Sequence, residues 1–537
     1  MCGIFGILGE EFIKNNLSQI KDALELIEHR GPDSASIDML DNERVLLGFH
    51  RLAIMDPSNK GNQPLNLNGY YLICNGEIYN YKKLIEDEGF EVKTGSDCEV
   101  ILHMYKKYGI DKTIRRLDGV FAFMLYDINN KVLHIGRDPV GVRPLFYFKR
   151  GNTHGFCSEV KSLSYLLDSF IEDDTKIEIF PPGSYMSISD YVKVDRFTYY
   201  NYDYSREISN LEDKEVMNNI KILFAKAVNK RLMSDRPLGC LVSGGLDSSL
   251  VASITSHLGI DNLETFSIGI GNSPDLNYAD EVAEYLGTKH HCIEMDIEDF
   301  INVVPDVIRS IESYDITTVR ASVPNYLLAQ YINRETDIKV ILSGEGADEI
   351  LGGYLYFHNA PDMQSFQNET HRRVRLLHQY DVLRSDRATA AHGLEVRVPF
   401  LDKDLINYVL SLEPRYKVHY DENEKRIEKY ILRKAFDGKY LPENILWRQK
   451  DAFSDAVGYN WVTSIKEFAN NEISDDEFSN REELYPYNTP DTKEAFYYRK
   501  IFEEYYPGRA ELISEMWRPL WSDTTEPSAT ALSIHKK

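Results

Sequence analysis

Cys2 is the first residue in the sequence that could carry covalent chemistry. It follows Met1 and precedes Gly3. If Met1 is removed, the chain begins with a free α-amino group, whose ordinary pKa of about 7.7–8.0 lets it act as a base for the neighbouring thiol. The thiolate could attack a carbonyl, and the oxyanion formed would need preorganised hydrogen-bond donors. Position alone leaves an alternative open, that Cys2 is a small buried apolar residue.

A second group with chemical potential is the string SGGLDSS at residues 243–249. Two glycines permit tight turns and the close approach of an anion, and successive N–H groups at a helix N-terminus favour negative charge. Asp247 would repel phosphate directly and suits a Mg²⁺ ligand instead. No lysine follows the glycines, so this is not a Walker A loop. A glycine turn capped by serine is the structural alternative.

Acidic and glycine residues also gather in SGEGADE at residues 343–349, directly after the apolar run Lys339–Leu342. Open α/β sheets place ligands at the carboxyl ends of their strands. We therefore expect this string to face Mg²⁺ and a nucleotide. The pair His290-His291 has no accompanying ligand spacing, so we expect a strand or helix end there rather than a metal site.

The elements that must position these residues differ between the two halves of the chain. Short strand-like runs separated by turn signals dominate the first ~200 residues, which predicts an α+β arrangement of layered sheets with helices outside. The expected strands are Arg44–Leu47, Tyr70–Cys74, Val120–Tyr126 and Val132–Ile135, and the expected helices are Leu17–His29 and Cys98–Tyr108.

The second half alternates strands and helices, which predicts an α/β domain with a parallel sheet. Val216, Ile220, Leu223 and Ala227 recur at helical spacing and predict a helix before the sheet. Strands are expected at Leu238–Val242, Glu264–Ile270 and Lys339–Leu342, a helix at Ser249–His257, and a mainly helical extension after Asp402. We place the domains at 2–205 and 214–522, with a polar linker near 203–213 and a polar tail at 523–537.

Composition narrows the class of protein. The net charge is -24, which argues against nucleic acid or an anionic membrane as the main partner. No apolar stretch is long enough to span a membrane, and the N-terminal residues lack the basic start of a signal peptide. The six cysteines are widely spaced, which favours reduced thiols and a cytoplasmic location over disulfides or zinc sites.

Five strings in the first hundred residues give a resemblance to the class II, N-terminal-nucleophile glutamine amidotransferases, which implies an αββα sandwich. They are CGIFGI from Cys2, HRGPD from His29, GFHRLAI from Gly48, CNGEIYN from Cys74 and GSDCE from Gly95. The resemblance implies that Asn75 and Gly76 form the oxyanion hole. It also implies that Arg51 holds the α-carboxylate of glutamine and that Glu77 and Asp97 receive its ammonium group. Leu52 and Ile54 would complete the glutamine site.

SGGLDSS resembles the pyrophosphate loop of ATP pyrophosphatases, and further strings resemble glutamine-hydrolysing asparagine synthetases in particular. These are TTVRAS from Thr317, LEVRVPFLD from Leu394, QKDAFSDAVGY from Gln449 and YNTP from Tyr487. The resemblance implies that Asp247 holds Mg²⁺ and that Asp348 holds the metal or lies on the pyrophosphate side. It also implies that Lys450 neutralises charge on the phosphates, that Glu345 lies beside the reacting aspartate and that Arg320 could bind it. The implied ATP-binding residues are Leu241, Ser243, Gly244, Gly245, Asp247, Ser248, Ser249, Ser267, Ile268, Ser343, Gly344 and Asp348.

The chemistry implied by this resemblance uses glutamine, aspartate and ATP as small-molecule substrates. Aspartate would be activated as β-aspartyl-AMP and then aminated by ammonia from the Cys2 site. The alternatives are another class II amidotransferase, a β-lactam-synthetase-like enzyme acting on a different carboxylate, and a non-catalytic sensor. The oligomeric state is left open by the sequence, with a homodimer as one option.

Overall fold

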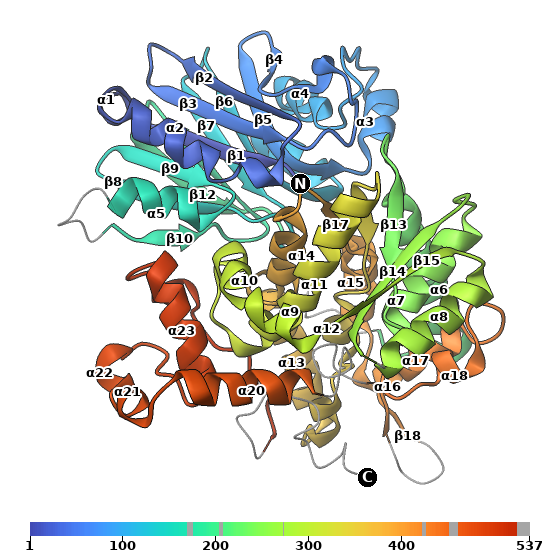
Figure 1. Ribbon diagram of the computed structural model, residues 1–537. Coiled ribbons are helices and arrows are strands. Elements are labelled where there is room, and N and C mark those ends of the chain that lie inside the picture. Colours follow the sequence, from blue (N-terminus) through green and yellow to red (C-terminus); the bar gives the residue numbers. More distant parts are fainter. Residues whose placement is uncertain (169–174, 203–207, 272, 421–425, 451–459, 523–537) are drawn as a thin grey trace. The chain divides into compact units, whose positions relative to one another are not determined.

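The computed structural model describes residues 1–168, 175–202, 208–271, 273–420, 426–450 and 460–522. It divides into two compact units, and each is described by itself (Figure 1). The first unit is Met1–Asn201 with Met233–Arg236 and Thr389–Glu395, and the second is Tyr202–Leu232, Pro237–Ala388 and Val396–Lys537. Among the described residues, no helix is long and apolar enough to cross a membrane. The predicted tail at 523–537 and residues 203–207 of the predicted linker lie outside the described residues.

Two six-stranded antiparallel sheets form the centre of the first unit. One has the strand order β10-β8-β9-β1-β3-β2 and the other β12-β11-β7-β6-β5-β4. The strands are β1 (Gly3–Leu8), β2 (Ser34–Leu40), β3 (Val45–Arg51), β4 (Leu65–Leu67), β5 (Tyr70–Ile78), β6 (Gly119–Asp127), β7 (Val132–Arg137), β8 (Phe146–Arg150), β9 (Thr153–Cys157), β10 (Ile177–Ile179), β11 (Ser184–Ser189) and β12 (Lys193–Thr198).

Alternating side chains of β6 show how the layers pack. Met124 belongs to a core shared with Ile4 and Phe49 of the first sheet, whereas Phe123 belongs to a core shared with Val100 of a helix. Because successive side chains point to opposite faces of a strand, this sheet is covered by the other sheet on one face and by helices on the other. The unit is therefore the predicted αββα sandwich. Its helices are α1 (Glu10–Asn15), α2 (Leu17–Glu25), α3 (Tyr81–Glu88), α4 (Glu99–Arg116) and α5 (Val160–Asp168).

Two predicted helices of this unit have different ends in the structure. The helix predicted to reach His29 ends at Glu25, and a separate 3-10 turn, Glu28–Arg30, follows it. The helix predicted to end at Tyr108 continues to Arg116 across Gly109, whose φ of 74° marks a kink. Glycine tolerates this left-handed conformation, so the chain resumes its helix instead of ending there.

A five-stranded sheet with the order β15-β14-β13-β16-β17 lies in the second unit. Its strands β13 to β16 pair in parallel, as predicted for this half. Strand β13 has β14 on one side and β16 on the other, so the strand order reverses there, and ligands bind at such a point in open α/β sheets. The strands are β13 (Leu238–Leu241), β14 (Glu264–Ile270), β15 (Lys289–Met295), β16 (Val340–Leu342) and β17 (Glu395–Arg397), with a separate pair β18 (His419–Tyr420) and β19 (Arg426–Ile427).

Helices surround this sheet and make up most of the described chain after Asp402 (Figure 1). The predicted helix before the sheet is α6, and Val216, Ile220 and Ala227 are buried in it, while Phe224 takes the buried place expected of Leu223. The helices are α6 (Asp213–Lys230), α7 (Leu246–His257), α8 (Pro274–Leu286), α9 (Ile297–Asn302), α10 (Val304–Ile311), α11 (Ile316–Glu335), α12 (Ala347–Leu351), α13 (Met363–Leu376), α14 (Asp381–Ala390), α15 (Lys403–Ser411), α16 (Pro414–Lys417), α17 (Tyr430–Ala435), α18 (Glu443–Leu446), α20 (Trp461–Glu472), α21 (Asp475–Ser479), α22 (Arg481–Leu484) and α23 (Lys493–Tyr505).

Candidate active sites

Cys2 lies immediately before β1, a central strand of the first sheet. The register pairs Gly3 with His50 of β3, so Cys2 comes next to the residues that follow β3. The Cys2 Sγ lies 3.7 Å from the carbonyl oxygen of Leu52, and Arg30 Nε donates a hydrogen bond to the carbonyl oxygen of Cys2 at 3.0 Å. Arg30 is in turn held by Glu159 at 2.7 Å. Both sides of Cys2 are thereby fixed by the fold.

Met1 is present in the encoded chain and changes the protonation of this site. It is buried, and its amino group lies 3.3 Å from the carbonyl oxygen of Leu394. Burial lowers the pKa of that amino group to about 5 and raises the pKa of the Cys2 thiol to about 11. While Met1 is attached, the nitrogen of Cys2 is a peptide nitrogen and cannot accept the thiol proton.

Asn75 is fully buried in β5, and neither its Nδ2 nor its Oδ1 has a hydrogen-bond partner among the described residues. A buried amide left in this state costs free energy unless a ligand or water meets it. The next residue must be glycine, because a Cβ at Gly76 would lie 2.2 Å from the carbonyl oxygen of Val120 on β6. The close pairing of β5 and β6 therefore sets the position of this candidate oxyanion hole.

Arg51 ends β3 and is buried. One terminal nitrogen donates to the Ser58 carbonyl at 2.8 Å and to Asn62 Oδ1 at 2.7 Å, and the other donates to the Met55 and Asp56 carbonyls. The guanidinium thus holds the loop 55–62 in place. A glutamine carboxylate would have to share or replace these acceptors, so its binding by Arg51 stays a prediction.

The remaining residues predicted to bind glutamine are also buried: Leu52, Ile54, Glu77 and Asp97. Asp97 Oδ2 accepts a hydrogen bond from the N–H of Ile78 at 2.5 Å, which ties the start of α4 to the end of β5. The negative charge of Glu77 contributes to the raised pKa of Cys2, after burial. Asp97 is thus joined to β5, the strand that carries Glu77, and the charge of Glu77 acts on the Cys2 thiol.

A cavity of about 1090 Å³, open solvent included, lies in the second unit at the carboxyl ends of β13, β14 and β16. Ligands of open α/β sheets bind at the carboxyl ends of the strands, where this cavity lies. Among the predicted ATP-binding residues, Gly244 and Ser249 do not line it. The lining residues from the prediction are Leu241, Ser243, Gly245, Asp247, Ser248, Ser267, Ile268, Ser343, Gly344 and Asp348, and Glu345 and Lys450 join them.

The phosphate loop is shaped by close backbone approaches. Gly244 has a φ of 68°, and a Cβ there would lie 2.4 Å from Tyr278 Cβ. Gly344 is constrained as well, because its Cβ would lie 2.6 Å from the backbone nitrogen of Ser248. Ser248 Oγ accepts a hydrogen bond from the N–H of Ser243 at 3.1 Å. The loop and the end of β16 therefore meet where α7 begins, and a helix N-terminus favours an anion.

Two acidic residues predicted at this cavity differ in their protonation. Burial raises the pKa of Glu345, and Ser343 Oγ donates to its carboxylate. Burial acts in the same direction on Asp348, but Lys429 and then Lys450 outweigh it and hold the pKa of Asp348 well below its ordinary value. Lys450 Nζ lies 2.8 Å from Asp348 Oδ2. The predicted lysine is thus in the cavity and charged, and Glu345 is the carboxyl more easily protonated.

Basic residues beyond the predicted Lys450 also line the cavity: Arg384, Lys429, Arg433 and Arg448. Arg448 donates to the carbonyl of Gly244 at 3.2 Å and pairs with Asp275 at 2.5 Å, so it braces the phosphate loop. These residues come from segments more than 130 positions after the loop, and no local spacing relates them to it. The only sequence signal is the place of Arg448 two residues before Lys450.

Arg320 is not brought to the cavity. Its guanidinium forms a buried, two-pronged pair with Glu494, with distances of 2.7 and 2.5 Å, and Trp461 Nε1 donates to its carbonyl at 3.2 Å. Binding of aspartate by Arg320 stays a prediction, and the geometry gives this residue a bracing contact between α11 and α23. The rest of the string after Lys450, residues 451–459, lies outside the described residues.

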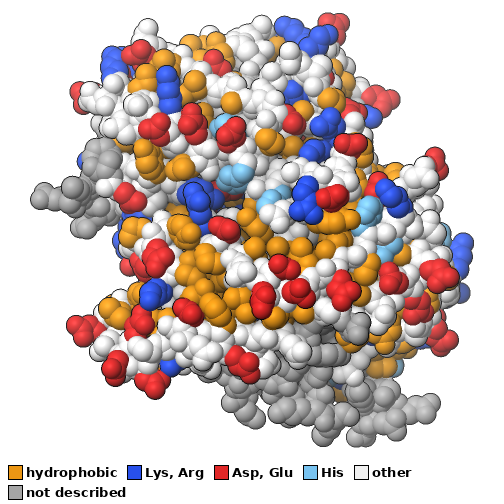
Figure 2. All heavy atoms as spheres, viewed as in Figure 1, with side chains coloured by type: hydrophobic (Ala, Val, Ile, Leu, Met, Phe, Trp, Pro, Cys, Tyr) orange, Lys and Arg blue, Asp and Glu red, His pale blue; other side chains and the backbone are white. Residues whose placement is uncertain are grey.

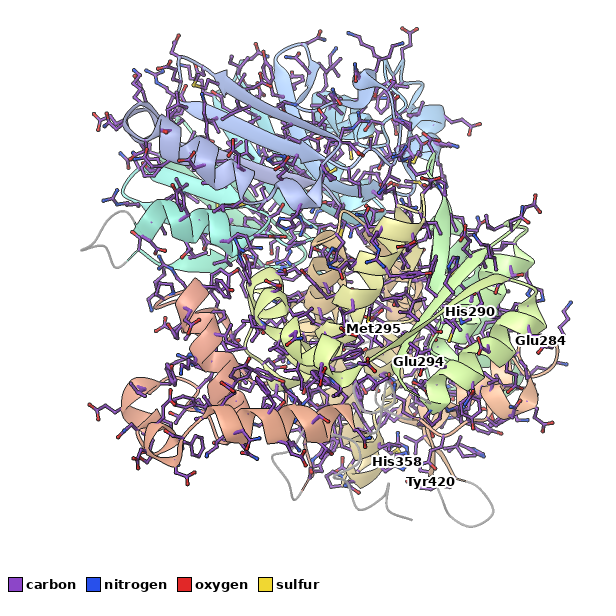
Figure 3. All side chains as sticks on the ribbon, viewed as in Figure 1. Glu284, His290, Glu294, Met295, His358 and Tyr420 are labelled. Carbon is purple, nitrogen blue, oxygen red and sulfur yellow. The ribbon has the colours of Figure 1, made fainter. Side chains whose placement is uncertain are left out.

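His290 lies on β15 with Glu294 and Met295 farther along the same strand (Figure 3). Its two ring nitrogens are 2.9 Å from Thr265 Oγ1 and 2.9 Å from Ser267 Oγ, both on the neighbouring strand. The ring therefore links two strands and positions a hydroxyl at the cavity. No cluster of three or more possible metal-binding side chains occurs in the described part of the chain.

The two acids predicted to hold Mg²⁺ nevertheless suit a metal that arrives with phosphates. Asp247 Oδ1 is buried and has no hydrogen-bond partner within the described ranges. Asp247 and Asp348 both line the cavity. Mg²⁺ commonly binds through one or two carboxylates, with phosphate oxygens and water completing its octahedron. The donor set of this cavity fits that pattern.

The two halves of the chain match different family models. Residues 1–200 match the glutamine amidotransferase domain, and residues 219–369 and 361–532 match asparagine synthase. The chain is 44% identical to asparagine synthetase [glutamine-hydrolyzing] of Homo sapiens, across 100% of this chain and 99% of that protein. It is 43% identical, over the same shares, to probable asparagine synthetase [glutamine-hydrolyzing] of Dictyostelium discoideum. The chain belongs to the asparagine synthetase family.

Solved structures add little beyond this. A structure titled allosteric regulatory enzyme of purine biosynthesis aligns with 55% of this chain and 80% of that chain, at 16% identity and a TM-score of 0.33. Membership in the family therefore rests on the sequence relatives, and the αββα architecture on the two sheets described above.

Proposed function

We propose that this protein makes asparagine from aspartate, using ATP and ammonia released from glutamine. The observation that carries the proposal is the full-length 44% identity to a relative named asparagine synthetase [glutamine-hydrolyzing]. The two sites support it, since one chain contains a candidate glutaminase cysteine and a candidate nucleotide cavity. We assign the first activity to residues 2–205 and the second to residues 214–522.

In the glutaminase half, the mature Cys2 amino group takes the thiol proton and the thiolate attacks the glutamine amide. Asn75 Nδ2 and the Gly76 N–H stabilise the oxyanion, while Glu77 and Asp97 receive the substrate ammonium group and Arg51 its carboxylate. Leu52 and Ile54 line the site. Ammonia leaves, and water hydrolyses the thioester to glutamate. The amide of Asn75 supports this role, because its donor is in place and no acceptor within the described part of the chain competes for it.

In the synthetase half, the β-carboxylate of aspartate attacks the α-phosphorus of ATP, forming β-aspartyl-AMP and releasing pyrophosphate. A carboxylate becomes a good acyl donor only when its oxygen leaves as a phosphate. Lys450 offsets the charge on the phosphates, and Glu345 lies beside the reacting carboxylate. Mg²⁺, held by Asp247 and Asp348, would supply further neutralisation of phosphate charge. Ammonia then displaces AMP and asparagine is formed.

The proposal is tested by product analysis of the full-length protein with glutamine, aspartate and Mg-ATP. AMP, pyrophosphate, glutamate and asparagine should appear in equal amounts. ADP in place of AMP would contradict adenylation. Amidation of another carboxylate in preference to aspartate would favour the related amidotransferase or β-lactam-synthetase-like alternative.

Cys2→Ala separates the two halves. It should abolish synthesis from glutamine, by at least about a thousandfold, and leave synthesis from free ammonia, because the nucleophile is lost and the ATP cavity is not touched. Cys292→Ala, at the exposed cysteine of β15, is the matched control and should keep both activities. Persistent glutamine use by Cys2→Ala would show that the nucleophile is elsewhere. A cytoplasmic location and a homodimer stay predictions, to be checked by fractionation and light scattering.

A further inference from the structure

One ammonium nitrogen lies between the two carboxylates assigned to Mg²⁺. Lys429 Nζ is 2.5 Å from Asp247 Oδ2 and 2.7 Å from Asp348 Oδ1. The side chain of Lys429 is 1% exposed, whereas most surface lysines keep their ammonium group in water. Lys450 contacts the other oxygen of Asp348, and no contact between Lys450 and Asp247 is formed at salt-bridge distance among the described residues.

The backbone is built to hold Lys429 in this position. Its φ of 53° is in the left-handed region, where a residue other than glycine is strained unless its surroundings hold it there. Gly353 lies against its side chain, and a Cβ at that glycine would be 2.8 Å from Lys429 Cε and 2.3 Å from Asp348 Oδ1. Glu428 accepts a hydrogen bond from the N–H of Lys450 at 2.8 Å, which joins the segments that carry the two lysines.

Two neighbouring carboxylates that are largely shielded from water, as Asp247 and Asp348 are with side chains 15% and 13% exposed, are stabilised by a cation between them, because their like charges repel one another. Lys429 already supplies one. A divalent ion coordinated by the same oxygens would lie close to the ammonium group, and two cations at such a distance in a cavity repel strongly. Either Lys429 or the metal can be bound between Asp247 and Asp348, but not both.

We propose that Lys429 is an internal cation that excludes Mg²⁺ from Asp247 and Asp348 until a nucleotide is bound. The phosphates of the nucleotide then offer the ammonium group new acceptors, Lys429 leaves the carboxylates, and the metal takes its place. The role of the metal rests on the function proposed above. Metal and nucleotide consequently bind together, and Lys429 acts as a positioning residue that prevents metal binding in the empty cavity.

The test is a titration of the full-length protein with Mn²⁺ in the absence of nucleotide. Electron paramagnetic resonance measures the free Mn²⁺ at each step of the titration. Lys429→Met should bind Mn²⁺ at least tenfold more tightly than the wild type, because it keeps the bulk of the side chain and removes its charge. Lys429→Arg keeps the charge and should bind as weakly as the wild type. Lys450→Met is the matched control, and its gain should be no more than a third of that of Lys429→Met, since the Lys450 ammonium group pairs with Asp348 and not with Asp247 among the described residues.

Two results would overturn the proposal: equal or weaker Mn²⁺ binding by Lys429→Met, and tight Mn²⁺ binding by the wild type without nucleotide. Cooperative thermal unfolding shows that a variant is folded. If Lys429→Met does not fold, Lys429→Gln is used in its place. Because the titration needs no turnover, its failure is distinct from failure of the proposed function, which would appear as absence of AMP and asparagine from the wild type.

Discussion

The side chain of Asn75 is buried although its polar amide lacks hydrogen bonds among the described residues. Both polar atoms of its amide are buried without a partner among the described residues, which costs about 1–3 kcal/mol for each buried group left unpaired. Asn75→Leu, with nearly the same shape, should leave the free energy of unfolding unchanged or raise it by up to about 2 kcal/mol. The same change should lower kcat for glutamine hydrolysis by about 10²–10³-fold, because one oxyanion donor is lost.

Urea unfolding and a glutaminase assay measure the two effects on the same sample. Asn80→Leu is a control, because the Asn80 amide forms hydrogen bonds with the backbone of Arg116 and Asp118. Its removal should lower the free energy of unfolding. Loss of stability in Asn75→Leu, with glutaminase activity kept, would show that Asn75 is a structural residue.

Met1 and Cys2 give a prediction about pH. With Met1 attached, burial raises the thiol pKa to about 11, so only about one ten-thousandth of it is thiolate at pH 7. Protein prepared while methionine aminopeptidase is inhibited should therefore lack glutaminase activity, and its Cys2 should react with iodoacetamide about ten times faster for each pH unit up to about 11. The mature chain should react faster at pH 7, since its α-amino group can accept the thiol proton.

Mass spectrometry of the N-terminal peptide measures this alkylation and shows whether Met1 is attached or removed. A thiol that reacts equally fast at pH 7 in both forms would show that the α-amino group is not its base.

Residues that belong to contiguous strings could be found from the sequence, and residues that act from a distance could not. Asp247, Asp348 and Lys450 stand in strings with a chemical character of their own, and the structure brings them to one cavity. Lys429 stands in a segment with no such character, and its contact with Asp247 spans 182 positions. Only the fold shows that Gly353 leaves space for it. The string around Arg320 predicts aspartate binding, which stays a prediction, and the contact of its guanidinium with Glu494 is visible only in the fold.

Close backbone approach at Gly76 and Gly344 is the constraint that acts at the scale of elements. A Cβ at Gly76 would lie 2.2 Å from a carbonyl of β6, and one at Gly344 would lie 2.6 Å from the first turn of α7. Gly76→Ala should destabilise the first unit by about 1–3 kcal/mol through overpacking and abolish glutamine hydrolysis. Gly344→Ala should instead abolish AMP formation, because β16 must move away from the phosphate loop.

Each of these variants is the control for the other. Glutamine hydrolysis should stay within about twofold of wild type in Gly344→Ala, and ammonia-driven AMP formation should do so in Gly76→Ala. Equal loss of both activities in both variants would show general unfolding rather than displacement of one strand. Circular dichroism at the assay temperature distinguishes these outcomes.

The types of the elements followed from local patterns more accurately than their ends did. Strand β14 has the predicted bounds, Glu264–Ile270, because its apolar residues are bounded by polar turns. Strand β3 was predicted as Arg44–Leu47 and runs from Val45 to Arg51. All residues of β3 are buried, including the small and charged residues at its end. The alternation of apolar and polar residues that marks a half-exposed strand is therefore absent, and the sequence does not show where the strand ends.

At the scale of the whole chain, the two units have separate cores and opposite charges are interspersed over the face drawn in Figure 2. The first unit also contains residues far along the chain, since the N–H of Asp56 donates to Asp235 at 2.8 Å and Met1 contacts Leu394. Boundaries drawn from the sequence at 205 and 214 miss these segments, because three-dimensional pairing rather than composition assigns them to the first unit.

Separate cores predict separate responses to ligands. A ligand at a hundred times its Kd stabilises the unit that binds it by about 2.7 kcal/mol. Mg-ATP should therefore slow amide hydrogen exchange in β13, α7 and α12 of the second unit, and alkylation of Cys2 by a glutamine-like diazoketone should slow it in β1, β3 and β5. Each ligand should leave the core strands of the other unit within about twofold of their free rates. If Mg-ATP slowed exchange equally in β5 and β13, the two cores would unfold as one cooperative body, and the two chemistries could not be altered independently by mutation.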